Sequence, residues 1–374
     1  MNVLFLSVSA GGGHLKAAEA LKECLELKYP GSKSVIVDTM KYINPIVDKL
    51  IIGSYLSAVK KTPAIYGKLY ELSDTGENIN NISKTVNKLL SFKIKKLINE
   101  LKPSVIVCTH PFPVQMLSNL RRKGRVNIPI VAVVTDYAVH PLWTFASLDA
   151  YVVPHEFLKL EAIEKGFSGD IIYPLGIPVS TNFLKKRDKS EILTELGLEE
   201  KLTVLLMGGS LGFGEVEDVF QALLHCEKDL QIIAVTGQNL KLKKQLENYS
   251  IVTGKNVKIL SYTEKVSDIM DISDLIITKP GGMTITESII KELPIVIMSP
   301  IPGQEEKNAN FLLNNGAAIR ITQNDNVASA LKQIIDDPTK VQKMKEAARR
   351  LSKPDSCSNI IELLEKLVIR NTKY

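Results

Sequence analysis

The sequence has few residues that could form a disulfide framework or a structural zinc site. Only 4 of its 374 residues are cysteines, and they stand singly at Cys24, Cys108, Cys226 and Cys357. Zinc sites use closely spaced cysteines and histidines, and disulfide-rich domains carry many more cysteines per residue. We therefore expect a cytoplasmic protein with reduced thiols.

Long apolar runs are also absent. No segment approaches the roughly 20 apolar residues that a membrane-spanning helix needs. Met1 to Ser9 contains no basic residue ahead of its apolar stretch, so it predicts a strand and not a secretory signal. The remaining composition, 45% hydrophobic and 24% charged, is that of a globular protein.

Negative charge is scarce in the first half of the chain. Residues 1–185 contain 22 Lys and Arg against 15 Asp and Glu, whereas residues 186–374 contain 25 against 26. The excess is concentrated in residues 33–102, which hold 12 lysines and 6 acids. Such a region suits an anionic membrane or nucleic acid, or is a solvated surface. Because no nucleic-acid motif accompanies the lysines, we expect no nucleic-acid partner.

Short apolar runs alternate with helical patterns, which is typical of α/β proteins with covered parallel sheets. The runs form two series along the chain. The expected strands of the first series are residues 3–8, 34–37, 105–108, 130–134, 150–153 and 171–173, and those of the second are 203–207, 230–235, 257–260, 275–278 and 295–298.

The rigid segment from Pro174 to Ser180 separates the two series and predicts a linker. We therefore expect two Rossmann-like, doubly wound α/β domains facing a cleft, with boundaries at 1–180 and 181–350. A final helix, 351–374, is expected to pack back toward the N-terminal domain. The segment from about 41 to 97 interrupts the alternation and predicts a helical insertion. Since ligands of such sheets bind at the carboxyl ends of strands, the turns there are the candidate site.

A glycine turn and His14 follow the first expected strand. The turn, Gly11-Gly12-Gly13, precedes a helix expected from His14 to Lys28, and its N–H groups suit phosphate or an oxyanion. It is not a P-loop, because Leu15 and Lys16 stand where Lys and Ser or Thr are needed, and it lacks the third glycine of a dinucleotide fingerprint. His14 is a candidate base or a polar residue of the helix N-terminus.

Three polar motifs follow strands of the second series, and they suit a sugar nucleotide. Lys279 offers a point charge for a diphosphate, and Glu287 can accept from vicinal ribose hydroxyls. The alternative for Glu287 is a capping-box acid paired with Thr284. Gln304 and Glu305 offer an amide and a carboxylate for sugar hydroxyls. The motifs are Gly208-Gly209-Ser210-Leu211-Gly212, Thr278-Lys279-Pro280-Gly281-Gly282-Met283-Thr284-Ile285-Thr286-Glu287 and Pro302-Gly303-Gln304-Glu305.

In the order of these motifs, the whole chain resembles the inverting glycosyltransferases with the two-domain GT-B fold. In particular it resembles the family of monogalactosyldiacylglycerol synthases and processive diacylglycerol glucosyltransferases, which is related to MurG. Thr135-Asp136 followed by His140-Pro141-Leu142-Trp143 adds to the resemblance. The resemblance implies that the C-terminal domain binds a UDP-sugar and that the N-terminal domain holds diacylglycerol.

By the same resemblance, different residues of the second domain would bind different parts of the UDP-sugar. Glu287 would bind the ribose, Gln304 and Glu305 the hexose, and Gly281, Gly282 and Thr284 would lie near the diphosphate. The remaining donor-binding candidates are Lys279, Gly209 and Ser210. The plant-type synthases carry an Asp in a Ser-Asp-Thr-Gly-Gly-Gly-His string. Here Ser9 stands in its place, so that carboxylate does not transfer as a base.

The reaction needs a base for the acceptor hydroxyl and stabilisation of the leaving diphosphate. His14 and Asp136 are the candidates for the base, with His140 and His110 behind them; Asp136 also fits a structural turn at a strand end. No Asp-x-Asp pair follows a strand. We therefore expect no metal and no other cofactor, with Lys279 and helix N-termini taking the place of a metal ion.

The function expected from these residues is transfer of a hexose, with glucose favoured, from a UDP-sugar to diacylglycerol with inversion. Lysines interleaved with large apolar residues suit an amphipathic surface on anionic lipid, so we expect a peripheral enzyme on the inner face of the cell membrane. Trp143, the single tryptophan, would lie at the lipid interface or pack in a core.

Four alternatives stay open at this stage. They are a UDP-galactose-dependent synthase, a MurG-like transfer of GlcNAc to a lipid-linked acceptor, a UDP-GlcNAc epimerase of related fold, and a catalytically silent UDP-sugar sensor. The residues do not predict the oligomeric state.

Overall fold

The computed structural model describes residues 1–9, 12–43, 92–139, 143, 147–209, 215–251, 255–321 and 327–372. These residues form two compact units. Unit 1 comprises Met1–Thr181, Pro302–Gln304 and Lys353–Tyr374, and unit 2 comprises Asn182–Ile301 and Glu305–Ser352. Most of the insertion expected at about 41 to 97 lies outside the described residues.

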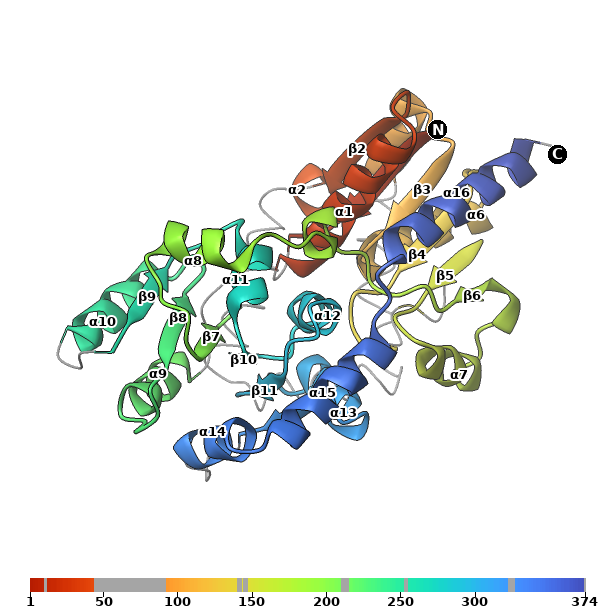
Figure 1. The fold of residues 1–374 in the computed structure, drawn as a ribbon. Coiled ribbons are helices and arrows are strands. Elements are labelled where there is room, and N and C mark those ends of the chain that lie inside the picture. Colours follow the sequence, from red (N-terminus) through yellow and green to blue (C-terminus); the bar gives the residue numbers. More distant parts are fainter. Residues whose placement is uncertain are drawn as a thin grey trace. The chain divides into compact units, whose positions relative to one another are not determined.

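Unit 1 contains a six-stranded parallel sheet in the order β2-β1-β3-β4-β5-β6 (Figure 1). The chain passes from β1 to β2 on one side and later to β3 on the other, so the topological switch point lies between β1 and β3. The strands are β1 (Asn2–Ser7), β2 (Lys33–Asp38), β3 (Val105–Cys108), β4 (Ile130–Val133), β5 (Ala150–Val152) and β6 (Ile172–Tyr173). The strand expected at 171–173 is shorter, because Gly169–Ile171 forms a 3-10 turn.

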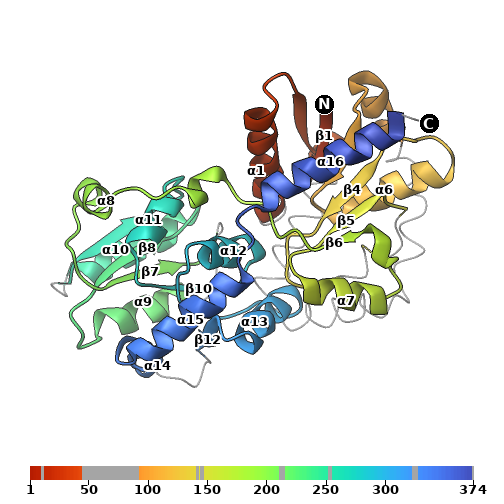
Figure 2. The same ribbon diagram turned by 45° about the vertical axis from the view of Figure 1, so that its right-hand side comes forward.

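Helices cover both faces of this sheet, and the first and last of them lie side by side (Figures 1 and 2). Their contact buries Leu21 and Leu25 of α1 against Ile360 and Leu364 of α16, all of them fully buried in one core with Phe5 of β1. The labelled helices are α1 (Gly13–Lys28), α2 (Thr39–Ile43), α6 (Pro111–Arg122), α7 (Glu156–Glu164) and α16 (Ser356–Thr372), and residues 92–101 are also helical.

Unit 2 contains a second six-stranded parallel sheet, in the order β12-β11-β10-β7-β8-β9, with its switch point between β7 and β10. Its strands are β7 (Thr203–Met207), β8 (Gln231–Val235), β9 (Val257–Leu260), β10 (Leu275–Thr278), β11 (Ile295–Ile297) and β12 (Ala318–Arg320). Its helices are α8 (Lys189–Leu196), α9 (Val216–Leu224), α10 (Leu240–Ser250), α11 (Val266–Ile272), α12 (Gly282–Ile290), α13 (Gln304–Asn314), α14 (Val327–Ile335) and α15 (Pro338–Leu351). The prediction of two Rossmann-like α/β domains is confirmed.

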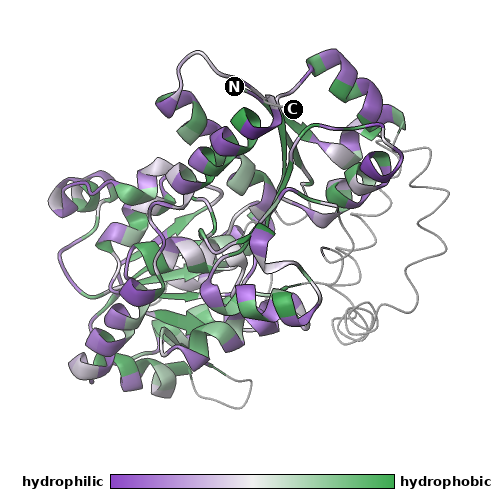
Figure 3. Cartoon of the chain, turned by 90° about the vertical axis from the view of Figure 1, so that its right-hand side faces the viewer, coloured by the Kyte–Doolittle hydropathy of each residue, from purple (hydrophilic) through white to green (hydrophobic). Residues whose placement is uncertain are grey.

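The strands are apolar because helices cover them on both faces (Figure 3). Residues of central strands such as Val107, Val131, Leu205 and Ile277 have no exposed surface. Among the described residues, no helix is both apolar enough and long enough to span a bilayer.

Trp143 packs in the core of unit 1, which confirms one of its two predicted alternatives and excludes the other, a place at a lipid interface. Its side chain is 4% exposed, and its ring meets that of Tyr151 edge to face at 5.9 Å between centroids. Tyr151 in turn stacks on Phe167 at 4.6 Å. Burial of the indole among other rings stabilises the folded protein more than its exposure to solvent would, because aromatic side chains bury large apolar surfaces.

The segment Pro174–Ser180 packs closely against the residues at the start of α16. Gly176 has φ of 96°, and a Cβ built on it would lie 2.6 Å from Cβ of Lys353 and 3.1 Å from Cβ of Ser356. Glycine is therefore required at this position for two reasons, the backbone conformation and the close approach of another chain segment.

We expect Gly176→Ala to destabilise the protein by about 3 kcal/mol, because strain at positive φ adds to overpacking against α16. Gly166→Ala is the matched control, since Gly166 has φ of 92° but a Cβ there would meet nothing within 4 Å. It should cost only about 1–2 kcal/mol. Urea unfolding measures both; equal losses would contradict the close packing at Gly176.

Candidate active site

Three hydroxyl side chains meet where β1, β3 and β4 end. Ser7 is the last residue of β1, Thr109 directly follows β3, and Thr135 is the second residue after β4. The Oγ1 atom of Thr109 donates to Oγ of Ser7 at 2.9 Å, and both residues are fully buried. This edge is the switch point of the unit 1 sheet, where doubly wound folds bind ligands.

His14 projects from the first turn of α1 into this cluster. Its Nδ1 lies 2.8 Å from the carbonyl oxygen of Thr109 and 2.7 Å from Oγ1 of Thr135. A carbonyl oxygen can only accept a hydrogen bond, so the Nδ1 atom carries the ring proton and donates a hydrogen bond to the carbonyl of Thr109. In the neutral ring, Nε2 therefore keeps its lone pair and is the basic nitrogen.

His110 lies against His14 in the opposite tautomer. It is the N-cap of α6, and its Nδ1 accepts from the backbone N–H of Phe112 at 3.1 Å. A neutral His110 therefore carries its proton on Nε2. The two rings meet edge to face, with centroids 4.7 Å apart and planes at 83°. His110 acts as a helix cap and as a wall of the His14 site.

Burial lowers the pKa of His14 below the ordinary value of 6.5, because desolvation penalises the charged imidazolium. The charge of Asp136 and the hydrogen bond to Thr109 oppose this effect but do not cancel it. His14 is therefore neutral at pH 7. Asp136, which follows Thr135 at the end of β4, is partly buried.

The structure thus brings His14, His110 and the charge of Asp136 together in unit 1. His140 lies outside the described residues. Sequence reasoning missed Thr109, whose backbone carbonyl selects the tautomer of His14. Its signal was its position, since it is the first polar residue after the fully buried strand 105–108.

In unit 2, α12 begins without a capping side chain. Its N-cap is Gly281, which makes no side-chain hydrogen bond, and the first turn contains no acid. Thr284 is therefore the third helical residue and not the cap, so the capping-box alternative for Glu287 was wrong. Uncapped N–H groups at the positive end of a helix are an anion-binding arrangement.

The turn between β10 and α12 is fixed by buried hydrogen bonds. Thr278 Oγ1 donates to the carbonyl of Met207 at 3.0 Å and joins the ends of β10 and β7. Asn308 of α13 is fully buried and donates to the carbonyl of Pro280 at 2.9 Å. The turn is thus held at the switch point of the sheet, beside Gly209, which has φ of 72°. Ser210 lies outside the described residues.

Lys279 is held in this turn by Glu305. Its Nζ lies 3.3 Å from Oε1 of Glu305, and the two side chains are 9% and 19% exposed. The other carboxylate oxygen of Glu305 accepts from the backbone N–H of Ile301 at 2.8 Å. The structure therefore brings Lys279 and Glu305 together, and the ammonium retains further donors for a ligand.

The other predicted donor-binding residues lie on the same two helices. Gly282, Thr284 and Glu287 belong to α12, where Thr284 and Glu287, three residues apart, share a face and are partly buried. Gln304 is the first residue of α13, next to Glu305. The described residues contain no cluster of three His, Cys, Asp or Glu side chains that could hold a metal ion.

Two family models together match most of the chain. Residues 14–179 match the model of monogalactosyldiacylglycerol (MGDG) synthase, and residues 203–360 match that of the glycosyltransferase family 28 C-terminal domain. The first match begins at His14 and the second contains β7 to α15, so each covers one of the two candidate sites.

Curated relatives match along the full length. The processive diacylglycerol beta-glucosyltransferase of Bacillus pumilus is 30% identical, with 100% of this chain and 97% of that protein covered. The enzyme of the same name from Bacillus licheniformis is 29% identical with the same coverage.

Solved structures share the fold at low identity. Acinetobacter baumannii MurG is 17% identical with a TM-score of 0.64, and 98% of this chain and 99% of that chain are covered. The UDP-GlcNAc 2-epimerase of Neisseria meningitidis is 13% identical with a TM-score of 0.63, over 98% and 100%. The fold alone therefore does not separate transferase from epimerase, but the full-length relatives do: the chain belongs to the family of monogalactosyldiacylglycerol synthases and processive diacylglycerol beta-glucosyltransferases.

Proposed function

We propose that the protein transfers a hexose from a UDP-sugar to diacylglycerol, with glucose as the favoured donor sugar. The observation that carries this proposal is the neutral, tautomer-fixed His14 at the switch point of unit 1, in a chain related over its full length to diacylglycerol beta-glucosyltransferases. Unit 1 would hold the acceptor lipid and unit 2 the donor.

His14 would act as the general base. Its Nε2 lone pair would take the proton of the acceptor hydroxyl as that oxygen attacks the anomeric carbon and UDP leaves from the opposite face, which inverts the configuration. The Thr109 carbonyl would hold the ring in the reactive tautomer throughout, because Nδ1–H donates to it before and after proton transfer. Asp136 would stabilise the imidazolium that forms, through its negative charge.

The donor would be held by α12 and the residues around it. The uncapped N-terminus of α12 at Gly281 and Gly282 and the ammonium of Lys279 would bind the diphosphate and stabilise its charge as UDP leaves. Glu287 would bind the ribose, and Gln304 and Glu305 the hexose; Gly209, Ser210 and Thr284 would complete the site. We propose that this arrangement needs no divalent metal, and undiminished transfer in EDTA would test it.

A galactose donor is the second candidate, because the family model matched by residues 14–179 is that of monogalactosyldiacylglycerol synthase. Incubation with diacylglycerol vesicles and UDP-glucose, UDP-galactose or UDP-GlcNAc in parallel, followed by mass spectrometry of the lipids, names the donor. Absence of a glycolipid with every donor would refute the proposed function.

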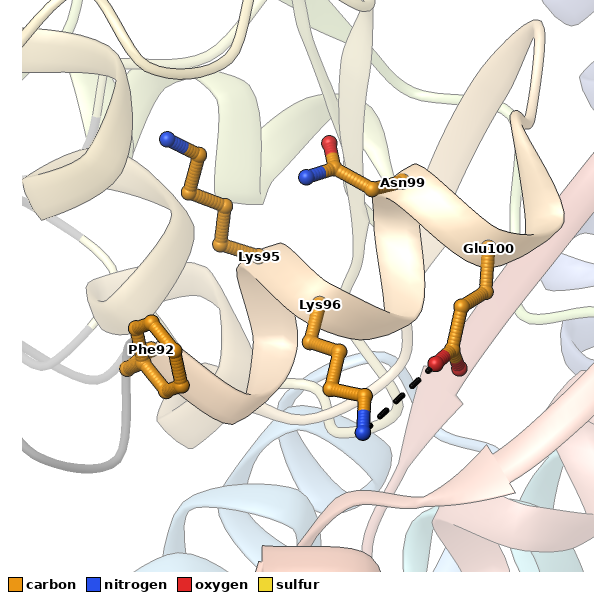
Figure 4. Close-up of a pocket in the computed structure, with 5 residues that line it drawn as sticks. All are labelled: Phe92, Lys95, Lys96, Asn99 and Glu100. Carbon is orange, nitrogen blue, oxygen red and sulfur yellow. Dashed lines mark ion pairs between the residues drawn. The ribbon is translucent and has the colours of Figure 1, made fainter.

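The helix 92–101 is the described part of the basic region that best suits a membrane surface. Its inner side buries Ile94, while Phe92 is 70% exposed. Phe92, Lys95, Lys96, Asn99 and Glu100 line a shallow pocket on its outer side (Figure 4). An aromatic ring among lysines suits the headgroup region of anionic lipid. We propose that this side of the helix rests on the inner face of the cell membrane.

Substitution of His14 tests the base. We expect His14→Gln to lower kcat by about 10²–10⁴-fold. In the unchanged protein, kcat/KM should fall only below pH 6.5, because a base whose pKa lies below 6.5 becomes protonated only there. The control is His155→Asn, since His155 also caps a helix with a pKa lowered by burial and Asn keeps the cap. If His155→Asn moved the acid limb of the profile, the assignment to His14 would fail.

Asp136→Asn separates the two candidates for the base. Loss of the negative charge should lower the pKa of His14 further, so the acid limb of kcat/KM should move to lower pH while most of kcat remains. If Asp136 were itself the base, the same variant would lose activity at every pH, and the acid limb of the kcat/KM profile would not move. A pH series of initial rates for the two proteins distinguishes these outcomes.

Lys279 should contribute to UDP binding. The double variant Lys279→Met/Glu305→Gln avoids leaving the Glu305 carboxylate without its ammonium, and we expect it to weaken UDP binding by about 10–100-fold, as for loss of a charge-assisted contact. The control removes the adjacent pair of Glu306 and Arg320, whose two contacts are each 2.8 Å, as Glu306→Gln/Arg320→Met. Isothermal titration calorimetry with UDP measures the affinity of both variants. Equal losses of affinity would mean that disturbance of the sheet edge, and not loss of a ligand contact, weakens UDP binding.

Charge reversal tests the membrane surface. Lys95→Glu/Lys96→Glu should lower binding to vesicles of anionic lipid by about tenfold or more, at roughly 1 kcal/mol for each lysine near the surface. Lys343→Glu/Lys345→Glu on α15 makes the same charge change on unit 2 and should bind as the parent protein does. Cosedimentation at low salt measures both, and equal binding by all three proteins would exclude this helix as the contact.

A further inference from the structure

Two cysteines from opposite ends of the sequence meet between α1 and α16, which lie side by side (Figures 1 and 2). Cys357 on α16 belongs to the buried core of unit 1, and Cys24 on α1 packs against the same core. Cys357 Sγ donates a hydrogen bond to the carbonyl of Val179 at 3.3 Å. Cys357 is 6% exposed, whereas Cys24 is partly exposed, so one thiol of the pair is reachable from solvent.

The pair lies where the chain leaves and re-enters unit 1, at Thr181 and Lys353. Glu23, next to Cys24, accepts from the hydroxyl of Ser180 at 3.0 Å and from that of Thr181. The connecting segment that ends at Thr181 is therefore fastened to α1 at the residue next to Cys24. A covalent link between the thiols would fix the start of α16 to the helix that carries His14.

The surroundings of Cys24 favour its thiolate. The neighbouring Cys357 thiol lowers the pKa of Cys24 to about 7; desolvation and Glu23 oppose this effect, and Lys28 supports it. Lys28 is itself paired with Glu362 of α16 at 2.8 Å. By contrast, burial raises the pKa of Cys108 well above its ordinary value, so that thiol stays protonated.

We propose that Cys24 and Cys357 form an oxidisable pair, which a low-molecular-weight disulfide converts into an intramolecular disulfide that fastens α16 to α1. The Cys24 thiolate attacks one sulfur of the small disulfide and expels the first thiolate, giving a mixed disulfide. Cys357 then loses its proton and attacks the Cys24 sulfur, which expels the second thiolate. One small disulfide is thereby reduced to two thiols, and the two cysteines are oxidised.

The second step is consistent with the environment of Cys357. The interaction with Cys24 is the largest cause that raises the pKa of Cys357, followed by desolvation. Because the mixed disulfide removes the thiolate of Cys24, that contribution disappears once the first step has occurred. Cys357 is then a resolving thiol in the same packed core as the sulfur that it attacks.

Treatment of the folded full-length protein with glutathione disulfide tests the proposal. We expect the intact mass to fall by two hydrogen atoms, and non-reducing peptide mapping to find Cys24 linked to Cys357. Cys357→Ala should stop at the glutathione adduct on Cys24, and Cys24→Ala should give neither product. Cys226→Ala, which changes a partly exposed cysteine of unit 2, should form the link as the parent protein does.

Alkylation kinetics give an independent readout. The rate at Cys24 should be half-maximal near pH 7 in the parent protein, and the midpoint should move toward the ordinary thiol pKa of about 8.5 in Cys357→Ala, which lacks the neighbouring thiol. An unreactive Cys24, a glutathione adduct that persists in the parent protein, or a link that forms only in denaturant would overturn the proposal. None of these measurements depends on glycosyl transfer, so they stand apart from the test of the proposed function.

Discussion

Parallel strands place all their carboxyl ends along one edge of a sheet, and this constraint positions the central groups of both candidate sites. In unit 1 it gathers Ser7, Thr109 and Thr135 from β1, β3 and β4, and α1 adds His14 to them. In unit 2 it places Lys279 at the end of β10, beside the end of β7. Because the switch points leave room beside the central strands, the polar groups there are available to ligands.

The two edges are built for different charges. Burial keeps His14 neutral, so unit 1 offers a lone pair for a proton. The N-terminus of α12 has neither cap nor acid, and Lys279 lies in the preceding turn, so unit 2 offers positive charge to an anion. A reaction that removes a proton from an alcohol and releases a diphosphate needs both kinds of site, and the family to which the chain belongs carries out this kind of transfer.

The last helix of the chain belongs to the first unit. Ile360, Ile361 and Leu364 are fully buried in the same core as Phe5 and Leu21, so α16 is part of the structure that supports α1. The close approach at Gly176 and the packing of Cys24 and Cys357 into one core lie along this seam. Packing on the seam therefore bears directly on the helix whose first turn carries His14.

The sequence by itself determined the two α/β sheets, because apolar runs between glycine turns follow from backbone geometry and burial that act locally. It also predicted that His14, Lys279 and Glu305 lie near the ends of strands, since the turns that follow strands of such sheets reach the same edge whatever the rest of the chain does. Only the tertiary structure decided the tautomer of His14, which depends on the backbone carbonyl of Thr109, an atom that every residue possesses. The neighbourhood of remote segments, such as those of Cys24 and Cys357, and the burial of Trp143 were likewise decided by packing, which no spacing along the chain encodes.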